Sequence, residues 1–237
     1  MPMPDEHTTQ QRTGRYFVLL FGYMMAQLAI LPMFEGNETL GAISDLAYVV
    51  VVFYVAYAIR HDNLFWTTAV FFGLILIFYG VLVLHPHERA VFVALNCAAG
   101  GFLVTVIVSL IGFILKQERI TLGGVLGGLC VYLLIGATFT VAYVNVELLR
   151  PGSFDFGVHG SDPDVLQLYD LLYFYSFVSL LTIGYGDIVP MSNLAQSLSV
   201  LEGVIGQFYL VFNMAVLVGM YVYGRQSPEA DRSGDGE

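Results

Sequence analysis

Residues 182–187 read Thr-Ile-Gly-Tyr-Gly-Asp, a run that can bind a cation through its backbone. Gly184 and Gly186 stand at alternate positions and permit backbone conformations that other residues avoid, which brings carbonyl oxygens into one line. Inside a membrane, non-helical backbone persists only where it is buried in protein or lines a watery path. A cation then takes the place of the missing hydrogen-bond donors. The run therefore predicts ion binding by carbonyl oxygens.

The composition places this run in a membrane. Hydrophobic residues make up 57% of the 237 residues, charged residues make up 12%, and the mean hydropathy is +0.73. These values lie outside the range of a soluble globular domain. We expect an all-α membrane protein with six transmembrane helices and a shorter re-entrant stretch at 163–181. The predicted spans are Tyr16–Met33, Leu40–Ile59, Leu64–Leu84, Ala90–Leu115, Ile120–Leu149 and Ala195–Tyr223.

The basic residues predict the orientation, because Lys and Arg concentrate in cytoplasmic loops. A cytoplasmic N-terminus places seven basic residues inside and leaves Arg89 and Arg150 outside. We therefore expect a multi-pass protein of the cell membrane with both termini cytoplasmic. The chain has a single Lys and no basic patch, so nucleic acid is not an expected partner. The seven inside residues are Arg12, Arg15, Arg60, Lys116, Arg119, Arg225 and Arg232.

The re-entrant stretch has its own helix start signal. Asp162 is the expected N-cap, Pro163 suits the first helical position, and Asp164 favours the positive end of the helix dipole. This helix is predicted to run inward from the outer face. Its partly negative C-terminal end then points toward the membrane centre, where it favours a cation.

Residues Phe174–Pro190 resemble the pore helix and selectivity filter of potassium channels, and the wider resemblance covers about Ile120–Tyr223. The resemblance implies that backbone carbonyls replace the hydration shell of K⁺, the permeant ion. One copy supplies one wall of such a cage, and the chain holds no second Thr-x-Gly-Tyr-Gly. A homotetramer in the lipid bilayer is therefore implied. The implied filter residues are Thr182, which also offers its hydroxyl, Ile183, Gly184, Tyr185 and Gly186.

The filter of this family is held by side chains behind it, and the sequence departs from the family pattern at two of them. Leu181 stands where a second threonine is common, so one hydroxyl is missing. Phe174 stands first in an aromatic pair whose members often donate hydrogen bonds, which Phe cannot do. Asp187 is expected at the outer mouth. The candidate bracing residues are Tyr175, Ser176, Ser179, Asp187 and Glu202.

The last predicted helix is expected to line the inner part of the pore. Gly206 stands where many family members carry a hinge glycine, although a packing role against another helix is the alternative. Glu202 is an acid deep in a span, which is costly and is a functional hypothesis by default. The alternative is that Glu202 lies near enough to the outer end to reach water. Helical spacing predicts a cavity lining of Gln207, Leu210, Met214 and Val218.

The expected domains are a cytoplasmic tail at 1–15, a four-helix transmembrane domain at 16–119, a pore domain at 120–223 and a cytoplasmic tail at 224–237. Because both tails are short in this sequence, no soluble ligand-binding domain is expected in it. Residues 90–115 contain no Lys or Arg, so the fourth helix cannot sense voltage and weak or absent voltage dependence is expected.

These expectations converge on a potassium-selective channel subunit that conducts K⁺ passively and is not an enzyme. Two alternatives stay open. The first is a weakly selective cation channel, against which the intact Gly184-Tyr185-Gly186 argues. The second is a non-conducting membrane scaffold or sensor, in which the glycine-rich turn is only structural.

Overall fold

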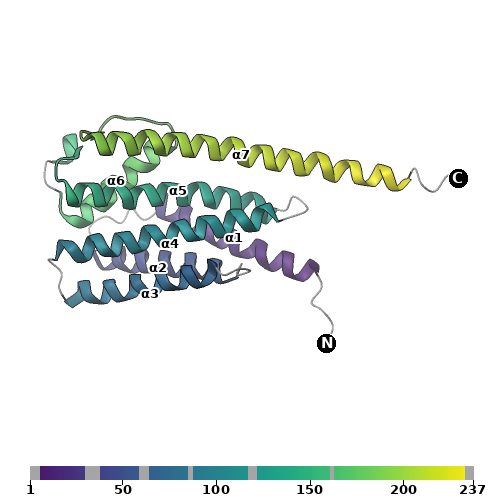
Figure 1. Cartoon of the computed structure of the whole chain (residues 1–237), viewed down its shortest axis with the longest axis horizontal. Coiled ribbons are helices and arrows are strands. Elements are labelled where there is room, and N and C mark those ends of the chain that lie inside the picture. Colours follow the sequence, from purple (N-terminus) through teal and green to yellow (C-terminus); the bar gives the residue numbers. More distant parts are fainter. Residues whose placement is uncertain are drawn as a thin grey trace. The chain divides into compact units, whose positions relative to one another are not determined.

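The structure, a computed structural model, describes residues 6–29, 38–58, 64–84, 88–116, 122–160 and 163–232. Most of these residues are helical (Figure 1). The helices are α1 Glu6–Ala29, α2 Glu38–Ala58, α3 Leu64–Leu84, α4 Arg89–Leu115, α5 Leu122–Leu149, α6 Val165–Leu180 and α7 Asn193–Arg232. The short elements are β1 Phe154–Asp155, the 3-10 helix η2 Gly157–His159 and β2 Val189–Pro190.

Four helices within the described residues are long and apolar enough to cross a membrane: α3, α4, α5 and the part of α7 at Asn193–Gly219. This confirms an all-α protein that passes through the membrane several times. Helices also form at the first two predicted spans, over 24 residues in α1 and 21 in α2. The count of six spans stays a prediction. The predicted helix ends Met33 and Ile59 and the predicted start Ile120 lie outside the described residues.

The membrane helices form because a lipid environment requires every backbone N–H and C=O to pair within its own segment. Helix α3 is an example: Leu64–Leu84 contains no charged residue and no proline. Thr68, one of its few polar side chains, donates its hydroxyl hydrogen bond to the Leu64 carbonyl oxygen at 3.0 Å. Helix α3 is apolar on all sides, as expected of a helix surrounded by lipid.

The chain divides into two compact units, and the first comprises residues 1–60, 109–131 and 209–237. Within its described part, Phe17 of α1 is fully buried and its ring lies 5.8 Å from that of Phe113. Gly127 of α5 leaves room for this ring, since a Cβ there would lie 3.2 Å from it. Tyr209 of α7 donates a hydrogen bond to the Gly128 carbonyl oxygen at 2.8 Å. A glycine of α5 thus allows close packing in this unit.

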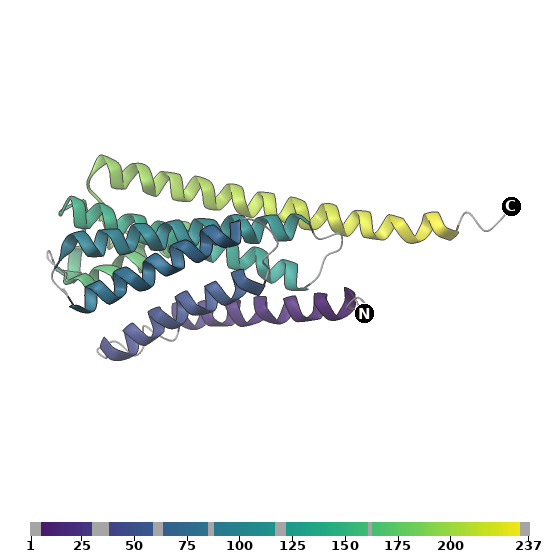
Figure 2. The ribbon, with the colours of Figure 1, turned by 60° about the horizontal axis from the view of Figure 1, so that its bottom comes forward.

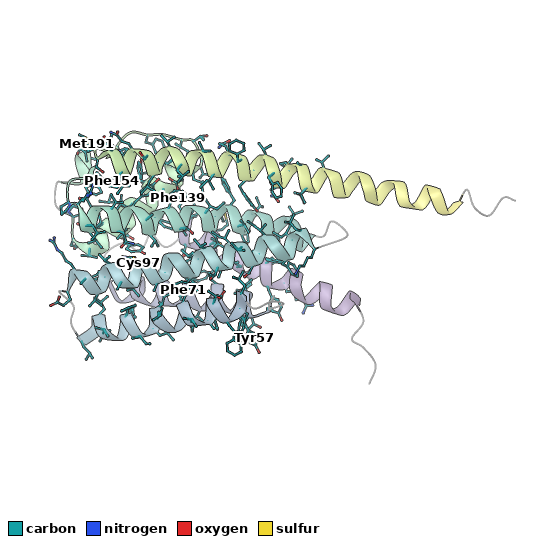
Figure 3. The ribbon with its side chains drawn as sticks, viewed as in Figure 1. Tyr57, Phe71, Cys97, Phe139, Phe154 and Met191 are labelled. Carbon is teal, nitrogen blue, oxygen red and sulfur yellow. The ribbon has the colours of Figure 1, made fainter. Side chains whose placement is uncertain are left out.

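The second unit comprises residues 61–108 and 132–208 and holds a core of aromatic and aliphatic side chains. The rings of Tyr143, Phe154 and Tyr175 meet edge to face, with centroids 5.3–5.5 Å apart. Each such pair contributes about 1 kcal/mol beyond its buried area. Phe139 packs against the same cluster from α5 (Figure 3). The cluster fixes the start of α6 and the loop before it against α5.

A two-stranded antiparallel ladder, which the sequence analysis did not predict, closes the loop that contains α6. Strand β1 pairs with β2 so that Phe154 faces Pro190 and Asp155 faces Val189. Beyond the ladder, the Met191 N–H donates to the Ser153 carbonyl oxygen at 2.7 Å. The chain before α6 and the chain after residues 182–187 are therefore joined at one base.

Helix α6 begins later than predicted. Its N-cap is Asp164, whose carboxylate accepts a hydrogen bond from the Gln167 N–H at 2.8 Å, and its first residue is Val165. The predictions of Asp162 as N-cap and Pro163 as first helical residue are therefore wrong. Asp164 lies three residues before a free N–H, the spacing that a capping side chain needs. Asp162 itself lies outside the described residues.

Replacing Asp164 by Ala is expected to destabilise the protein by about 1 kcal/mol, because the Gln167 N–H loses its capping acceptor. Asp164→Asn is the matched control, since its amide oxygen keeps the acceptor. The measurement is the thermal unfolding midpoint of the detergent-solubilised protein. Equal midpoints for the two variants would contradict the cap.

Candidate functional site

The run at 182–187 begins in a defined helix-ending motif. The Ile183 N–H donates to the Val178 carbonyl oxygen at 2.9 Å, and the Thr182 N–H donates to the Ser179 carbonyl oxygen at 3.0 Å. These two bonds form a Schellman motif, which normally places Gly in the left-handed conformation at the position of Thr182. Thr182 has φ 58°, so a β-branched residue occupies a strained conformation here. Such strain is typical of functional positions.

Positive φ recurs at every second residue of the run. Thr182, Gly184 and Gly186 have φ of 58°, 65° and 75°, whereas Ile183 and Tyr185 do not have positive φ. In a regular strand successive carbonyls point to opposite sides. Alternating the handedness of successive residues turns them toward the same side. The two glycines therefore adopt the kind of conformation that the sequence analysis expected, and Thr182 extends the pattern by one residue.

The backbone oxygens of this run are free to bind something else. Among the described residues, no N–H or hydroxyl donates to the carbonyls of 182–186. Residues 181–186 are all exposed. In a hydrocarbon medium, unpaired carbonyls cost several kcal/mol each. The run therefore needs a polar ligand or water.

Phe174, which cannot donate a hydrogen bond, contacts the run through its ring. The rings of Phe174 on α6 and Tyr185 lie 6.2 Å apart and nearly parallel, with an interplanar angle of 6°. Stacking of this kind restrains the Tyr185 ring without a hydrogen bond. Contact between the run and α6 is therefore apolar at this point.

Within the part of the chain that the structure describes, three predicted bracing residues make no side-chain hydrogen bond to residues 182–186. Tyr175 shares a 2.7 Å hydrogen bond with Ser199 and so joins α6 to α7. The Ser179 hydroxyl has no hydrogen bond within the described residues. The Asp187 carboxylate also accepts none there, and Asp187 meets the preceding loop through its carbonyl oxygen, beside Gly157. A Cβ on Gly157 would lie 2.7 Å from that oxygen, so the close approach requires glycine.

Glu202 is fully buried and joins three helices. Its Oε2 accepts a hydrogen bond from the Tyr143 hydroxyl of α5 at 2.6 Å. Its Oε1 lies 2.5 Å from the Ser176 hydroxyl of α6, which also lies 2.8 Å from the Gly136 carbonyl oxygen of α5. Glu202 therefore contacts Ser176 of α6, the helix of the predicted re-entrant stretch, whereas its bracing of a filter stays a prediction. The alternative that Glu202 reaches water at the outer end is wrong for this chain, because Tyr143 and Ser176 cover it.

The end of α6 is held by residues that the sequence analysis missed. The Tyr132 hydroxyl of α5 donates to the Leu180 carbonyl oxygen at 2.8 Å, which satisfies a carbonyl that has no partner within its helix. The signal for Tyr132 and Tyr143 was available in the sequence. A buried tyrosine in an apolar span requires a hydrogen-bond partner for its hydroxyl.

Leu180 is fully buried between two glycines. A Cβ on Gly206 of α7 would lie 2.5 Å from Leu180 Cδ1, and a Cβ on Gly136 of α5 would lie 3.1 Å from Cδ2. Helix α7, the green-to-yellow helix in Figure 2, is one continuous helix over Asn193–Arg232, a range that includes Gly206. The structure therefore gives Gly206 a role in close approach to α6. Its role as a hinge stays a prediction.

The predicted cavity lining lies on a part of α7 that this chain leaves largely uncovered. Only 11% of the apolar span of α7 is buried. Gln207 is exposed, Met214 and Val218 are 60% and 55% exposed, and Leu210 is half-buried. These side chains are available to line a cavity or to meet another copy.

Replacing Gly206 by Ala is expected to lower stability by about 1–3 kcal/mol, because Leu180 must move to admit the new methyl group. Gly203→Ala is the matched control, since a Cβ at this position of the same helix meets nothing within 4 Å. Thermal unfolding of both variants measures the difference. A Gly206→Ala protein that unfolds at the same temperature as Gly203→Ala contradicts the packing role.

Comparison with known proteins gives one similarity, and it falls on the site. Residues 156–223 match a family model described as "Ion channel". The match extends from the loop after β1 through α6 and the run at 182–187 into α7. No curated protein and no solved structure matches the chain. The protein is thus a multi-pass membrane protein in which residues 156–223 are similar to an ion channel domain.

Proposed function

We propose that this chain is one subunit of a homotetrameric, potassium-selective channel that conducts K⁺ passively across the cell membrane. The observation that carries the proposal is the backbone of 182–186, with positive φ at alternate residues and carbonyls that no described residue satisfies. The similarity of residues 156–223 to an ion channel domain supports the same reading. No covalent chemistry is required, so we propose no enzymatic activity.

In the proposed pore, four copies of the run face one another around an axis. The carbonyls of Thr182, Ile183, Gly184 and Tyr185, with the Thr182 hydroxyl, replace the water around K⁺. Gly186 completes the run at its outer end. The need for partner copies is supported by exposure: Tyr185 is 68% exposed and Phe208 of α7 is 71% exposed in the single chain. Large apolar side chains of this kind mark a surface that meets lipid or protein.

The helix before the run supplies favourable electrostatics. Helix α6 ends at Leu180, directly before the run, and contains no basic residue. Its C-terminal end carries a partial negative charge, which favours a cation. The same end is held by Tyr132 and by the Gly136–Leu180–Gly206 packing. We infer that this packing keeps the dipole aimed at the ion path.

The proposed channel is not gated by voltage. Helix α4 carries Arg89 at its first residue and Lys116 follows its end, with no basic residue between them. A voltage sensor needs several charges within the membrane field. The excess of basic residues in the predicted inner loops supports cytoplasmic termini.

The proposal is tested by ion flux from purified protein in liposomes. Wild-type protein is expected to pass K⁺ and to exclude Na⁺ under matched gradients. Gly184→Ala is expected to reduce K⁺ flux at least tenfold, because a side chain at φ 65° is strained by about 1–2 kcal/mol and shifts the carbonyl positions. Each of the four copies in the proposed pore carries the change.

Gly152→Ala is the matched control for this experiment. Gly152 has φ 82° and open space around its Cβ position, as Gly184 has, but it lies in the loop before β1. It therefore imposes similar backbone strain away from the run. Equal K⁺ flux from wild type, Gly184→Ala and Gly152→Ala contradicts the proposal that residues 182–186 form the filter. Equal Na⁺ and K⁺ flux from wild type indicates a weakly selective cation channel, and no flux indicates a non-conducting scaffold.

A further inference from the structure

The contacts around Glu202 need more protons than the hydroxyl groups supply. Three oxygen pairs lie within hydrogen-bond distance: Tyr143 hydroxyl with Glu202 Oε2, Ser176 hydroxyl with Glu202 Oε1, and Ser176 hydroxyl with the Gly136 carbonyl oxygen. Each pair needs one hydrogen between its oxygens. Tyr143 and Ser176 bring one hydrogen each, and a backbone carbonyl brings none. One hydrogen is missing.

A protonated Glu202 supplies it. The acid then donates from Oε1 to the Ser176 oxygen, Ser176 donates to the Gly136 carbonyl oxygen, and Tyr143 donates to Oε2. An ionised carboxylate leaves one of the two Ser176 contacts with lone pairs facing each other. The Thr140 hydroxyl lies 3.1 Å from the same Gly136 oxygen, to which it donates. It is therefore not another acceptor for Ser176, and Ser176 still has one hydrogen for its two contacts.

Among the residues that the structure describes, no positive charge is found beside Glu202 to compensate an ionised carboxylate. Helices α5, α6 and residues 193–224 of α7 contain no Lys, Arg or His. The ionisable groups that face Glu202 are tyrosines of α5, namely Tyr143 and Tyr132. Glu202 is fully buried, and a buried carboxylate without a cation is far less stable than the neutral acid.

We propose that Glu202 is a neutral carboxylic acid at neutral pH and that its proton joins α5, α6 and α7 behind the run at 182–187. Glu202 is thus a positioning residue: it touches no proposed ion ligand, and it holds α6 through Ser176. Only its effect on the ion path rests on the proposed function. Loss of the proton at alkaline pH places an uncompensated charge between three helices and loosens their junction.

Infrared spectroscopy tests the protonation state directly. The difference spectrum of wild type minus Glu202→Gln at neutral pH is expected to contain the C=O stretching band of a protonated carboxylic acid. That band is expected to disappear as the pH of the wild-type sample rises. A difference spectrum that holds only carboxylate bands at neutral pH overturns the proposal.

Stability gives a second test. The Gln amide donates to the Ser176 oxygen and accepts from Tyr143, as the neutral acid does, so Glu202→Gln is expected to unfold at the wild-type temperature at neutral pH. Glu202→Ala is expected to unfold at a lower temperature, because Ser176 and Tyr143 lose a partner. A Glu202→Gln protein that fails to fold, or unfolds as early as Glu202→Ala, contradicts the proposal, since Gln replaces an ionised carboxylate poorly.

The pH dependence separates the proton from ordinary packing. Near neutral pH the folded protein holds a proton on Glu202 that the unfolded chain releases. The unfolding equilibrium constant of wild type, relative to that of Glu202→Gln, is therefore expected to rise about tenfold per pH unit. This rise ends at the pH at which the folded protein also loses the proton. Identical pH dependence in the two proteins overturns the proposal. None of these measurements uses ion flux. An acid band without K⁺ flux supports a neutral Glu202 and contradicts the channel proposal. K⁺ flux without the acid band supports the channel proposal and contradicts a neutral Glu202.

Discussion

The second unit of this protein is organised around one constraint: a membrane tolerates unpaired backbone oxygens only where something other than lipid meets them. The carbonyls of 182–186 have no donor within the described residues, and much of the surrounding structure holds them in that state. The ladder of β1 and β2 joins the two ends of the loop.

The restraints act on α6 more than on the run. Tyr132 binds the last turn, Tyr175 and Ser176 tie the middle to α7, and Asp164 caps the start. On the run itself, the ring of Phe174 stacks on that of Tyr185. Side-chain contacts thus fix α6, the helix that precedes the run, whereas the conformation of the run depends on its own backbone angles. Strain at Thr182 persists because the Schellman bonds overdetermine it.

Sequence reasoning located the helices well, because uninterrupted apolar stretches leave a chain in lipid few alternatives. The bounds of α3 and of the predicted Leu64–Leu84 coincide. It failed at the start of α6, where two aspartates compete as caps and only the geometry of the Gln167 N–H decides. It also missed the ladder, since two residues per strand leave no periodic pattern. The sequence indicates that a buried Tyr143 needs a partner, but not that this partner is Glu202, because 59 residues separate the two.

The position of Leu180 between Gly136 and Gly206 has a mechanical consequence. An isobutyl group seated against two bare backbone surfaces has little room to move, so a bend of α7 toward α6 at Gly206 displaces Leu180. Leu180 is the last residue of α6 and its carbonyl is bound by Tyr132, so any such displacement acts two residues before the run begins. In the channel proposed above, movement of α7 at Gly206 and distortion of residues 182–186 are then coupled through Leu180. In such a protein, a gate in α7 and a gate at 182–186 would open and close together.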